Sequence, residues 1–165
     1  MRHIITILLQ NEAGALARVA NMFAARGYNI DSLSVAPTHD PTVSRLTLAT
    51  AGSDNVIEQI IKQTRKLIEV VEIVDLSSAD HIECELVMVK VAVDADSARK
   101  VVECVREHRA QVLDETGDTR MIQLAGTGQE IDTLVTELGK VTNILEVDRS
   151  GLAAMARGRH IVAVA

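Results

Sequence analysis

The sequence predicts an α+β protein made of two ferredoxin-like βαββαβ domains in tandem, and three observations support this prediction. The apolar residues of the first 76 positions follow the order strand, helix, strand, strand, helix, strand. The same order recurs between residues 83 and 149, and a polar segment at 77–83 separates the two runs. A chain with this order commonly folds into a four-stranded antiparallel sheet with both helices on one face.

The first run opens with a strand and a helix. Residues 3–9 (HIITILL) are apolar on both faces and rich in β-branched side chains, as in a central strand. Residues 14–26 follow a helical period, with an apolar stripe of Leu16, Val19, Ala20 and Phe23. Gly27 is well placed to end this helix in a left-handed conformation. We therefore expect only a short turn between the strand and the helix.

The first run continues with two strands, a helix and a final strand. Residues 29–36 and 43–50 alternate between apolar and polar side chains, and a loop sequence (THDPT) joins them. Gly52-Ser53-Asp54 supplies the start of the next helix, and 70–76 is the last strand. The apolar stripe predicted for this helix consists of Val56, Ile57, Ile60, Ile61, Thr64, Leu67 and Ile68.

The second run contains the same six elements. We expect strands at 83–93, 110–116, 119–126 and 141–148, and helices within 94–109 and at 128–140. Gly117-Asp118 predicts a tight hairpin between the second and third of these strands. Asp96 or Ser97 is the expected cap of the first helix.

These patterns divide the chain into domains at 1–77 and 78–165. The tail from Arg149 has no counterpart in the first domain, so we expect it to dock on another surface. Its end at 160–165 (HIVAVA) alternates and suggests an added strand or a docking segment. Each predicted sheet has helices on one face only, and its other face and its edges need cover. We therefore expect a homodimer.

Composition excludes several classes of function. The net charge of -6 and the pI of about 5.3 give no basic footprint for nucleic acid, and aromatic residues make up only 1% of the chain. No segment approaches the roughly 20 apolar residues that span a bilayer. The start of the chain is better interpreted as a strand than as a signal peptide. With only two cysteines there is no secreted disulfide framework, and we expect a cytoplasmic protein.

The turn after the first strand is the first candidate site. Backbone N–H groups at a helix start have no internal partner and attract anions such as carboxylates. Gly14 lacks a Cβ and lets a ligand approach the backbone, while Asn11 offers both a donor and an acceptor. An ordinary turn, with Asn11 as a cap and Gly14 chosen for its dihedral angles, explains the same residues. Asn29 leaves the same choice open, as a turn residue or as an amide presented at a domain edge.

The cysteines and histidines suggest a metal site only weakly. His81 and Cys84 are three residues apart, and Cys104 and His108 lie one helical turn apart, so four ligands for zinc are conceivable. Both cysteines also fit core positions, where a free thiol behaves as a small apolar group. We favour the core interpretation and expect no metal.

Catalytic patterns are equally poor. Ser32, Ser34 and Ser44 lack evident His or Asp partners, and 125–130 (AGTGQE) lacks the lysine of a phosphate-binding loop. Paired acids such as Asp94 and Asp96 are typical of strand ends and turns. We expect no catalytic residue.

Several segments of the first domain carry a family resemblance, and two later segments support it. The segments are NEAGALARV (11–19), RGYNIDSLSVAPT (26–38), PTVSRLT (41–47), IVDLSSADHIECELVMVKV (73–91) and RSGLAAMARG (149–158). Over essentially its full length, and in order, the chain resembles the small regulatory subunits of acetolactate synthase (acetohydroxyacid synthase).

The resemblance implies a regulatory role rather than catalysis. In that family the first domain is an ACT domain, a small-molecule regulatory module, and the second is a ferredoxin-like C-terminal domain. The subunit dimerises and binds a catalytic subunit. It raises the activity of that subunit and makes it sensitive to feedback inhibition by branched-chain amino acids, typically valine. Thiamine diphosphate, magnesium and FAD belong to the catalytic subunit, so no cofactor is expected on this chain.

The resemblance also implies an effector site at the interface between two ACT domains. One chain contributes the turn residues Asn11, Ala13, Gly14, Ala15 and Leu16, and the other contributes Asn29 and Ile30.

Two alternatives to this regulatory function remain. One is a free-standing ACT sensor that regulates another enzyme or transcription. The other is a small enzyme on a ferredoxin-like fold, for which the sequence shows no cluster of titratable residues. We expect the tail to contact the catalytic subunit.

Overall fold

The computed structural model describes residues 1–163, in which two four-stranded sheets each carry two helices. The first sheet has the strand order β2-β3-β1-β4 and the second the order β6-β7-β5-β8. In both sheets the first strand of the run is central, as a βαββαβ unit requires. The predicted fold class is confirmed. Within residues 1–163 no helix combines the length and the apolar character needed to cross a membrane.

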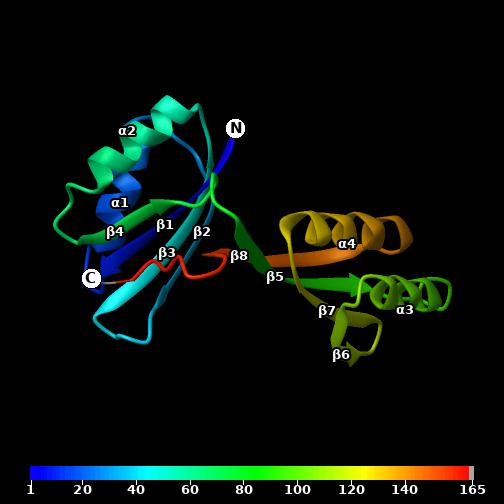
Figure 1. The fold of residues 1–165 in the computed structure, drawn as a ribbon. Coiled ribbons are helices and arrows are strands. Elements are labelled where there is room, and N and C mark those ends of the chain that lie inside the picture. Colours follow the sequence, from blue (N-terminus) through cyan, green and yellow to red (C-terminus); the bar gives the residue numbers. More distant parts are fainter. Residues whose placement is uncertain (164–165) are drawn as a thin grey trace. The chain divides into compact units, whose positions relative to one another are not determined.

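The first unit follows the predicted order, with α1 and α2 side by side over one face of the sheet (Figure 1). Its elements are β1 (Arg2–Gln10), α1 (Ala15–Ala24), β2 (Ile30–Pro37), β3 (Val43–Ala51), α2 (Asp54–Thr64) and β4 (Val70–Asp75). All strand pairs are antiparallel, and β1 matches β3 along its whole length, from Arg2 opposite Ala51 to Gln10 opposite Val43. Since β2 pairs only with β3, it is an edge strand.

The core of the first unit lies between this sheet and the two helices. Its buried residues are Ile5, Ile7, Leu9, Val19, Phe23, Leu46, Leu48, Ile57, Ile60 and Ile73. Helix α1 ends before Gly27, which has the predicted left-handed conformation at φ 72°. The predicted stripe of α2 extended too far, because the helix ends at Thr64 and Ile68 is 87% exposed in the turn that follows.

The second unit repeats the pattern. Its elements are β5 (His81–Ala92), α3 (Ala98–Glu107), β6 (Gln111–Thr116), β7 (Thr119–Gly126), α4 (Gly128–Val141) and β8 (Ile144–Ala156). The predicted hairpin is present, with Gly117 at φ 57° in the two-residue turn between β6 and β7. Valines of β5, residues of α3 and α4, and Ile122 form a separate aliphatic core.

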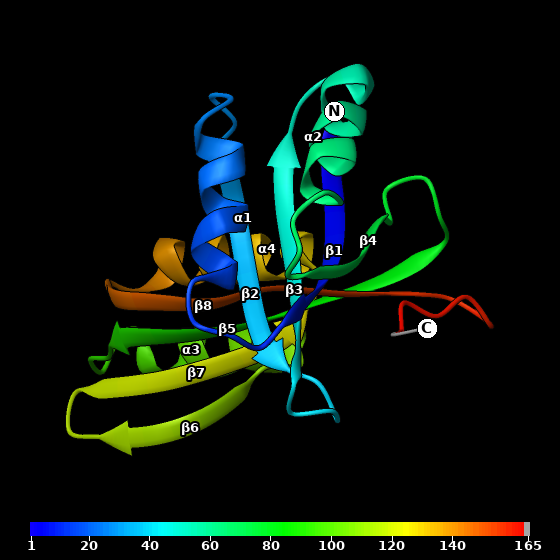
Figure 2. The ribbon, with the colours of Figure 1, turned by 90° about the vertical axis from the view of Figure 1, so that its left-hand side faces the viewer.

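Contacts within the chain assign the tail to the first unit. One unit is Met1–Ile82 together with the chain from Gly151 onward, and the other is Glu83–Ser150. This assignment differs from our expectation of a second domain at 78–165. The physical reason is the length of β8, whose 13 residues continue past Gly151 (Figure 2, orange to red).

The end of β8 covers the sheet face of the first unit that α1 and α2 leave open. Leu152 and Ala154 are buried there in a cluster with Ile4, Ala49 and Leu76. The Leu152 N–H donates to Ser32 Oγ at 3.3 Å, and Arg45 Nη2 donates to the Ala154 carbonyl at 3.0 Å. The tail therefore supplies part of the cover that we expected from a second copy.

Gly151 makes this packing possible. Its φ is 78°, and a Cβ built on it would lie 2.8 Å from the Leu33 carbonyl oxygen of β2. A side chain is therefore opposed both by the backbone conformation and by a backbone atom.

The predicted strand at 160–165 is not present over the part that the structure describes. Residues 160–163 have no regular structure, and Val164 and Ala165 lie outside the described residues.

Candidate functional site

The turn between β1 and α1 is open. Gly14 occupies the N-cap position of α1 at φ 89° and ψ -11°, and it makes no side-chain cap because it has no side chain. A Cβ built on Gly14 would meet no heavy atom within 4 Å. A ligand atom can therefore approach the backbone here without displacing the protein.

Backbone N–H groups are available at this turn. Among residues 1–163, the amides of Gly14, Leu16 and Ala17 have no backbone or side-chain acceptor, and the Ala15 N–H reaches the Glu12 carbonyl only at 3.3 Å. Unpaired amides at a helix start carry partial positive charge and attract an anion. The turn can therefore bind a carboxylate through its backbone.

Asn11 fixes the turn to the loop between β2 and β3. Its Nδ2 donates to the Pro41 carbonyl at 2.9 Å, and its backbone N–H donates to the Thr42 carbonyl at 2.7 Å. A carbonyl only accepts, so this contact determines which end of the amide is the nitrogen. Within the described chain Oδ1 has no donor, which leaves it free to accept from an ammonium group.

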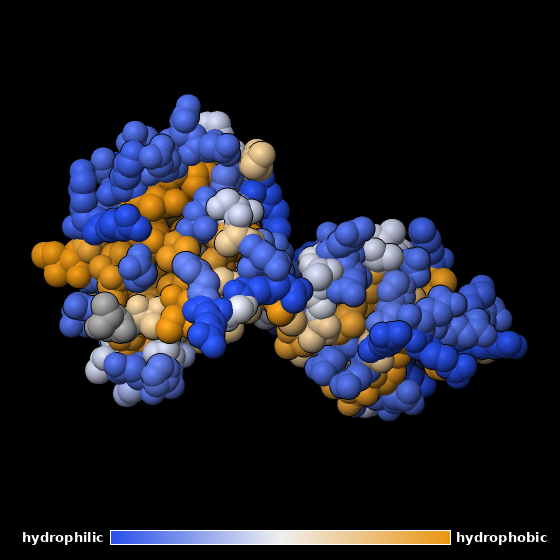
Figure 3. Space-filling view, in the orientation of Figure 1, coloured by the Kyte–Doolittle hydropathy of each residue, from blue (hydrophilic) through white to orange (hydrophobic). Residues whose placement is uncertain are grey.

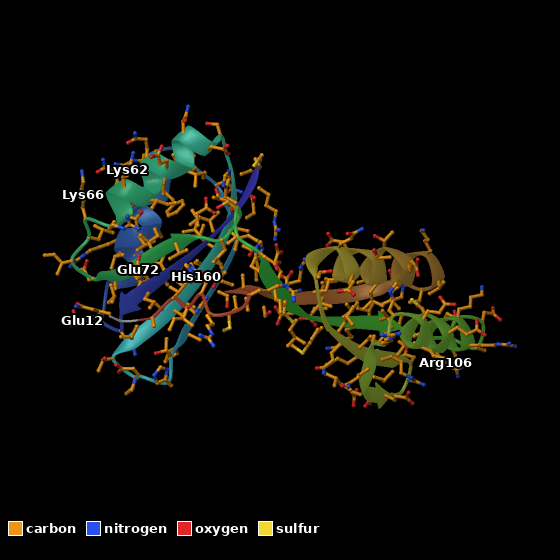
Figure 4. All side chains as sticks on the ribbon, in the orientation of Figure 1. Glu12, Lys62, Lys66, Glu72, Arg106 and His160 are labelled. Carbon is orange, nitrogen blue, oxygen red and sulfur yellow. The ribbon has the colours of Figure 1, made fainter. Side chains whose placement is uncertain are left out.

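The charged side chains around the turn do not fill it. Figure 4 shows Glu12 projecting away from the sheet at the end of β1. Arg18, one turn into α1, forms an ion pair with the mostly buried carboxylate of Glu69. Since this cation already has a partner, a ligand carboxylate at the turn depends mainly on backbone N–H groups.

The three remaining turn residues differ in burial. Ala13 is exposed, whereas Ala15 is buried and anchors the helix start on the core together with Val19. Leu16 is 40% exposed, so its assignment to the core stripe of this helix was wrong. The reason is that Ala15, Val19 and Phe23 form the buried row, and Leu16 lies about 100° further round the helix. An exposed Leu16 beside the turn provides an apolar surface for a ligand.

Asn29 and Ile30 lie at the start of β2. Asn29 is exposed, its Nδ2 donates to Asp31 Oδ1 at 2.7 Å, and its carbonyl accepts from Thr50 Oγ1 at 2.6 Å. Ile30 pairs with Thr50 and packs partly against the core.

One chain does not bring these two residues to the turn. They follow the end of α1, whereas the turn precedes its start, and a helix of 10 residues is about 15 Å long. Within residues 1–163 no hydrogen bond links 29–30 to 11–16.

The corresponding turn of the second unit is closed by its own side chains. Thr127 caps α4, its backbone N–H donates to Glu130 Oε2 at 2.7 Å, and the Glu130 N–H donates back to Thr127 Oγ1 at 3.3 Å. The hydrogen bonds that the N–H and the Oγ1 of Thr127 donate to Glu130 Oε2 lower the pKa of Glu130. A Cβ built on Gly126 would lie 2.9 Å from the same carboxylate. The second unit thus places a carboxylate of its own at the helix start, a position that the first unit leaves open.

The sulfur and imidazole groups are arranged differently from the sequence expectation. Cys84 is exposed, so its predicted place in the core was wrong, whereas Cys104 is buried as expected. Cys104 and His108 of α3 meet Glu137 of α4, with one ligand atom from each within 4.8 Å of the others. Sequence spacing could not find Glu137, because it comes from another helix.

Of the serines considered as nucleophiles, Ser32 has a structural contact. Its Oγ accepts the N–H of Leu152 at the end of β8.

Comparison with known proteins covers both units. A family model described as the AHAS small subunit-like ACT domain matches residues 5–72, and one described as the small subunit of acetolactate synthase matches residues 84–158. The acetolactate synthase isozyme 3 small subunit of Salmonella typhimurium is 43% identical over 162 residues, which is 98% of this chain and 99% of that protein. The acetolactate synthase small subunit of Aquifex aeolicus is 41% identical, over 97% of this chain and 83% of that one.

A solved structure agrees with the fold. The crystal structure of an acetolactate synthase small subunit from Thermotoga maritima matches with a TM-score of 0.87 and 31% identity. The match covers 97% of this chain and 99% of that chain.

Proposed function

The chain belongs to the family of acetolactate synthase small subunits, and on that premise we propose that it regulates an acetolactate synthase complex through a branched-chain amino acid. The chain activates a catalytic subunit and makes it sensitive to feedback inhibition, with valine as the first candidate effector. Thiamine diphosphate, magnesium and FAD reside on the catalytic subunit, and the complex is cytoplasmic.

The observation that carries this proposal is the open turn at Gly14. A free amino acid presents a carboxylate, an ammonium group and a side chain. The unpaired N–H groups of Gly14, Leu16 and Ala17 suit the carboxylate. The free Oδ1 of Asn11 suits the ammonium group, and the exposed face of Leu16 suits a branched aliphatic side chain.

A second copy of the chain completes the site. Asn29 and Ile30 lie at the far end of α1 from their own turn, so they reach a turn only in another chain. The edge strand β2 offers unpaired backbone groups and exposes Leu33 and Val35, which favours pairing with a copy. Apolar atoms reach the surface of the first unit in Figure 3 as well. A two-fold dimer formed in this way has two equivalent effector sites.

Regulation follows from linkage between the effector and the state of the dimer. An effector that binds one arrangement of the dimer better than another shifts the population toward it. If the catalytic subunit responds to that arrangement, effector binding and activity are coupled. Leucine and isoleucine are isomers with one methylene more than valine, and a methylene is worth about 1–3 kcal/mol, so inhibition is graded among the three.

Reconstitution with a purified catalytic subunit tests the proposal. Adding the chain should raise turnover, and valine should then lower it, whereas valine should have little effect on the catalytic subunit alone. Calorimetry on the isolated chain measures valine binding in parallel. If turnover is unchanged with and without the chain, the regulatory role is wrong. If valine binds while turnover stays unchanged, the chain is a sensor for another partner.

A further inference from the structure

The second unit contains a cluster of metal-ligating side chains that the proposed regulatory site does not use. Cys104 lies in the last turn of α3 and His108 is the C-cap residue of that helix, so the two are one turn apart, at the spacing that places side chains on the same face. Glu137 reaches them from α4, which packs against α3. Two packed helices therefore present a thiol, an imidazole and a carboxylate to one another.

The geometry of the three side chains is close to that of a bound ion. A tetrahedral zinc ion with bonds of about 2.0–2.3 Å places neighbouring ligand atoms about 3.3–3.6 Å apart. Here the ligand atoms all lie within 4.8 Å of one another, and His108 Nε2 is 2.7 Å from Glu137 Oε2. The His108–Glu137 separation is thus shorter than in such a site, and binding an ion would require these side chains to rotate apart.

We propose that Cys104, His108 and Glu137 form a binding site for a divalent transition-metal ion of the zinc class. Thiolate, imidazole and carboxylate are the three ligand types that proteins use for zinc, and three protein ligands leave a fourth position for water. No group in the regulatory site participates, so this inference is independent of the proposed function.

Burial and charge favour an ion at this place. Exposure increases from the buried Cys104 through His108 to the part-exposed Glu137, which gives an ion a route to the thiol. Burial, with the nearby charges of Glu137 and Glu107, raises the pKa of the Cys104 thiol. The hydrogen bond with His108 lowers the pKa of Glu137, so a cation meets a charged carboxylate there, and its binding releases the thiol proton.

A structural explanation competes with the metal site. His108 and Glu137 form a hydrogen-bonded pair that joins α3 to α4, and Cys104 fills the core beneath them as a small apolar residue. In that case the thiol has no part in metal binding. The two explanations differ in whether Cys104 bonds to an added ion.

Cobalt(II) is the probe, because its absorption reports a bond to thiolate. The untagged full chain is titrated with Co²⁺, and Zn²⁺ is then added. We expect a thiolate-to-cobalt charge-transfer band that saturates at one ion per chain and that Zn²⁺ removes. Cys104→Ser should abolish the band, and Glu137→Gln should weaken Co²⁺ binding by at least about tenfold. Cys84→Ser is the matched control, because it removes the exposed thiol outside the cluster, and it should bind as the parent does.

The site is excluded if the parent chain gives no charge-transfer band, or if the band persists in Cys104→Ser. It is equally excluded if Cys84→Ser is the variant that loses the band. Circular dichroism checks that each variant folds. If Cys104→Ser does not fold, His108→Gln and Glu137→Gln decide the matter, and unchanged Co²⁺ affinity in both overturns the proposal.

Discussion

Gly14 and Gly151 both have positive φ values, but for different physical reasons. Gly14 faces open space, so its lack of a side chain keeps room for something outside the chain. Gly151 lies against the Leu33 carbonyl, so its lack of a side chain lets the tail pack on β2. The first glycine serves a ligand in our account, and the second serves the fold.

Gly14→Asp should abolish inhibition by valine in the reconstituted complex while activation survives. The new carboxylate takes the place of the ligand carboxylate and repels it. Gly14→Asn is the matched control, because it has nearly the same volume and the same positive φ without the charge. Inhibition should weaken in the order parent, Asn, Asp. If both variants lose activation as well, Gly14 is needed for folding rather than for the ligand.

Gly151→Ala should destabilise the chain more than Gly158→Ala does. Both positions have positive φ, which costs an alanine about 1–2 kcal/mol, but Gly158 has no atom within 4 Å of an added Cβ. The contact with the Leu33 carbonyl should add about 1–3 kcal/mol for Gly151 alone. Urea unfolding of the two variants measures the difference. Equal free energies of unfolding in the two variants would show that the close approach of Gly151 to β2 does not contribute to stability.

At this scale, sequence reasoning works best where the structure is local. The sequence placed Gly14 in the turn before the helix, and it has a positive φ there, whereas the contacts of Asn11 with Pro41 and Thr42 come from another loop and could not be read from spacing. The roles of Gly14 and Asn11 toward an effector stay a prediction. Leu16 was given two roles. Its place in the core stripe was wrong by one step around the helix, and its contact with an effector stays a prediction. Glu137 could not be associated with Cys104 from spacing, because the contact depends on how two helices pack.

The two units show how one element, the start of a helix, can be closed or open. At α4 the pair Thr127 and Glu130 satisfies the first N–H groups, as the sequence pattern of a capping box indicates. At α1 no side chain does so, because Gly14 stands in the capping position and Ala17, not an acid, stands three residues later. The same fold thus offers a ligand position in one unit and fills it in the other.

The end of β8 is the element that the sequence predicted least well. Strand boundaries such as 119–126 follow from periodicity and turn residues, which act locally. Leu152 and Ala154 pack on the first sheet through contacts with residues more than 70 positions away in the sequence. Such contacts cannot be predicted from a local sequence pattern. The alternation at 160–165 suggested a strand, yet the ordered strand ends at Ala156.

Leu152→Ala should destabilise the first unit by about 2–5 kcal/mol, because Leu152 is 2% exposed and its loss leaves a cavity beneath the tail. Met155→Ala is the control from the same strand. Met155 is 63% exposed, and its removal should change the free energy of unfolding by less than about 0.5 kcal/mol. Denaturant unfolding compares the two. Similar small effects would mean that the tail does not contribute to the fold of the first unit.

For the whole molecule, the order of elements and the full-length resemblance together gave the correct fold class and family. The two sheets have the strand orders expected for βαββαβ units, and the family models match both units. The cover provided by the tail was not foreseen, since a bare sheet face is equally consistent with a partner chain. The effector site is a prediction about two chains, and the single chain shows only where the predicted residues lie.

Because each dimer site in this account takes its turn from one chain and Asn29 from the other, two defective chains should complement each other. Gly14→Asp and Asn29→Ala homodimers should each fail to bind valine. A mixed dimer of the two variants has one doubly altered site and one intact site. Random assortment makes half of the dimers mixed, so about a quarter of the parental sites should reappear.

Calorimetric counting of valine sites in a co-refolded equimolar mixture of the two variants is therefore the most direct test. Each homodimer, refolded alone, is the control. Recovery of about a quarter of the parental sites, at parental affinity, is the predicted result. No recovery, with both variants folded and mixed dimers confirmed by native mass spectrometry, would contradict a site shared between two chains.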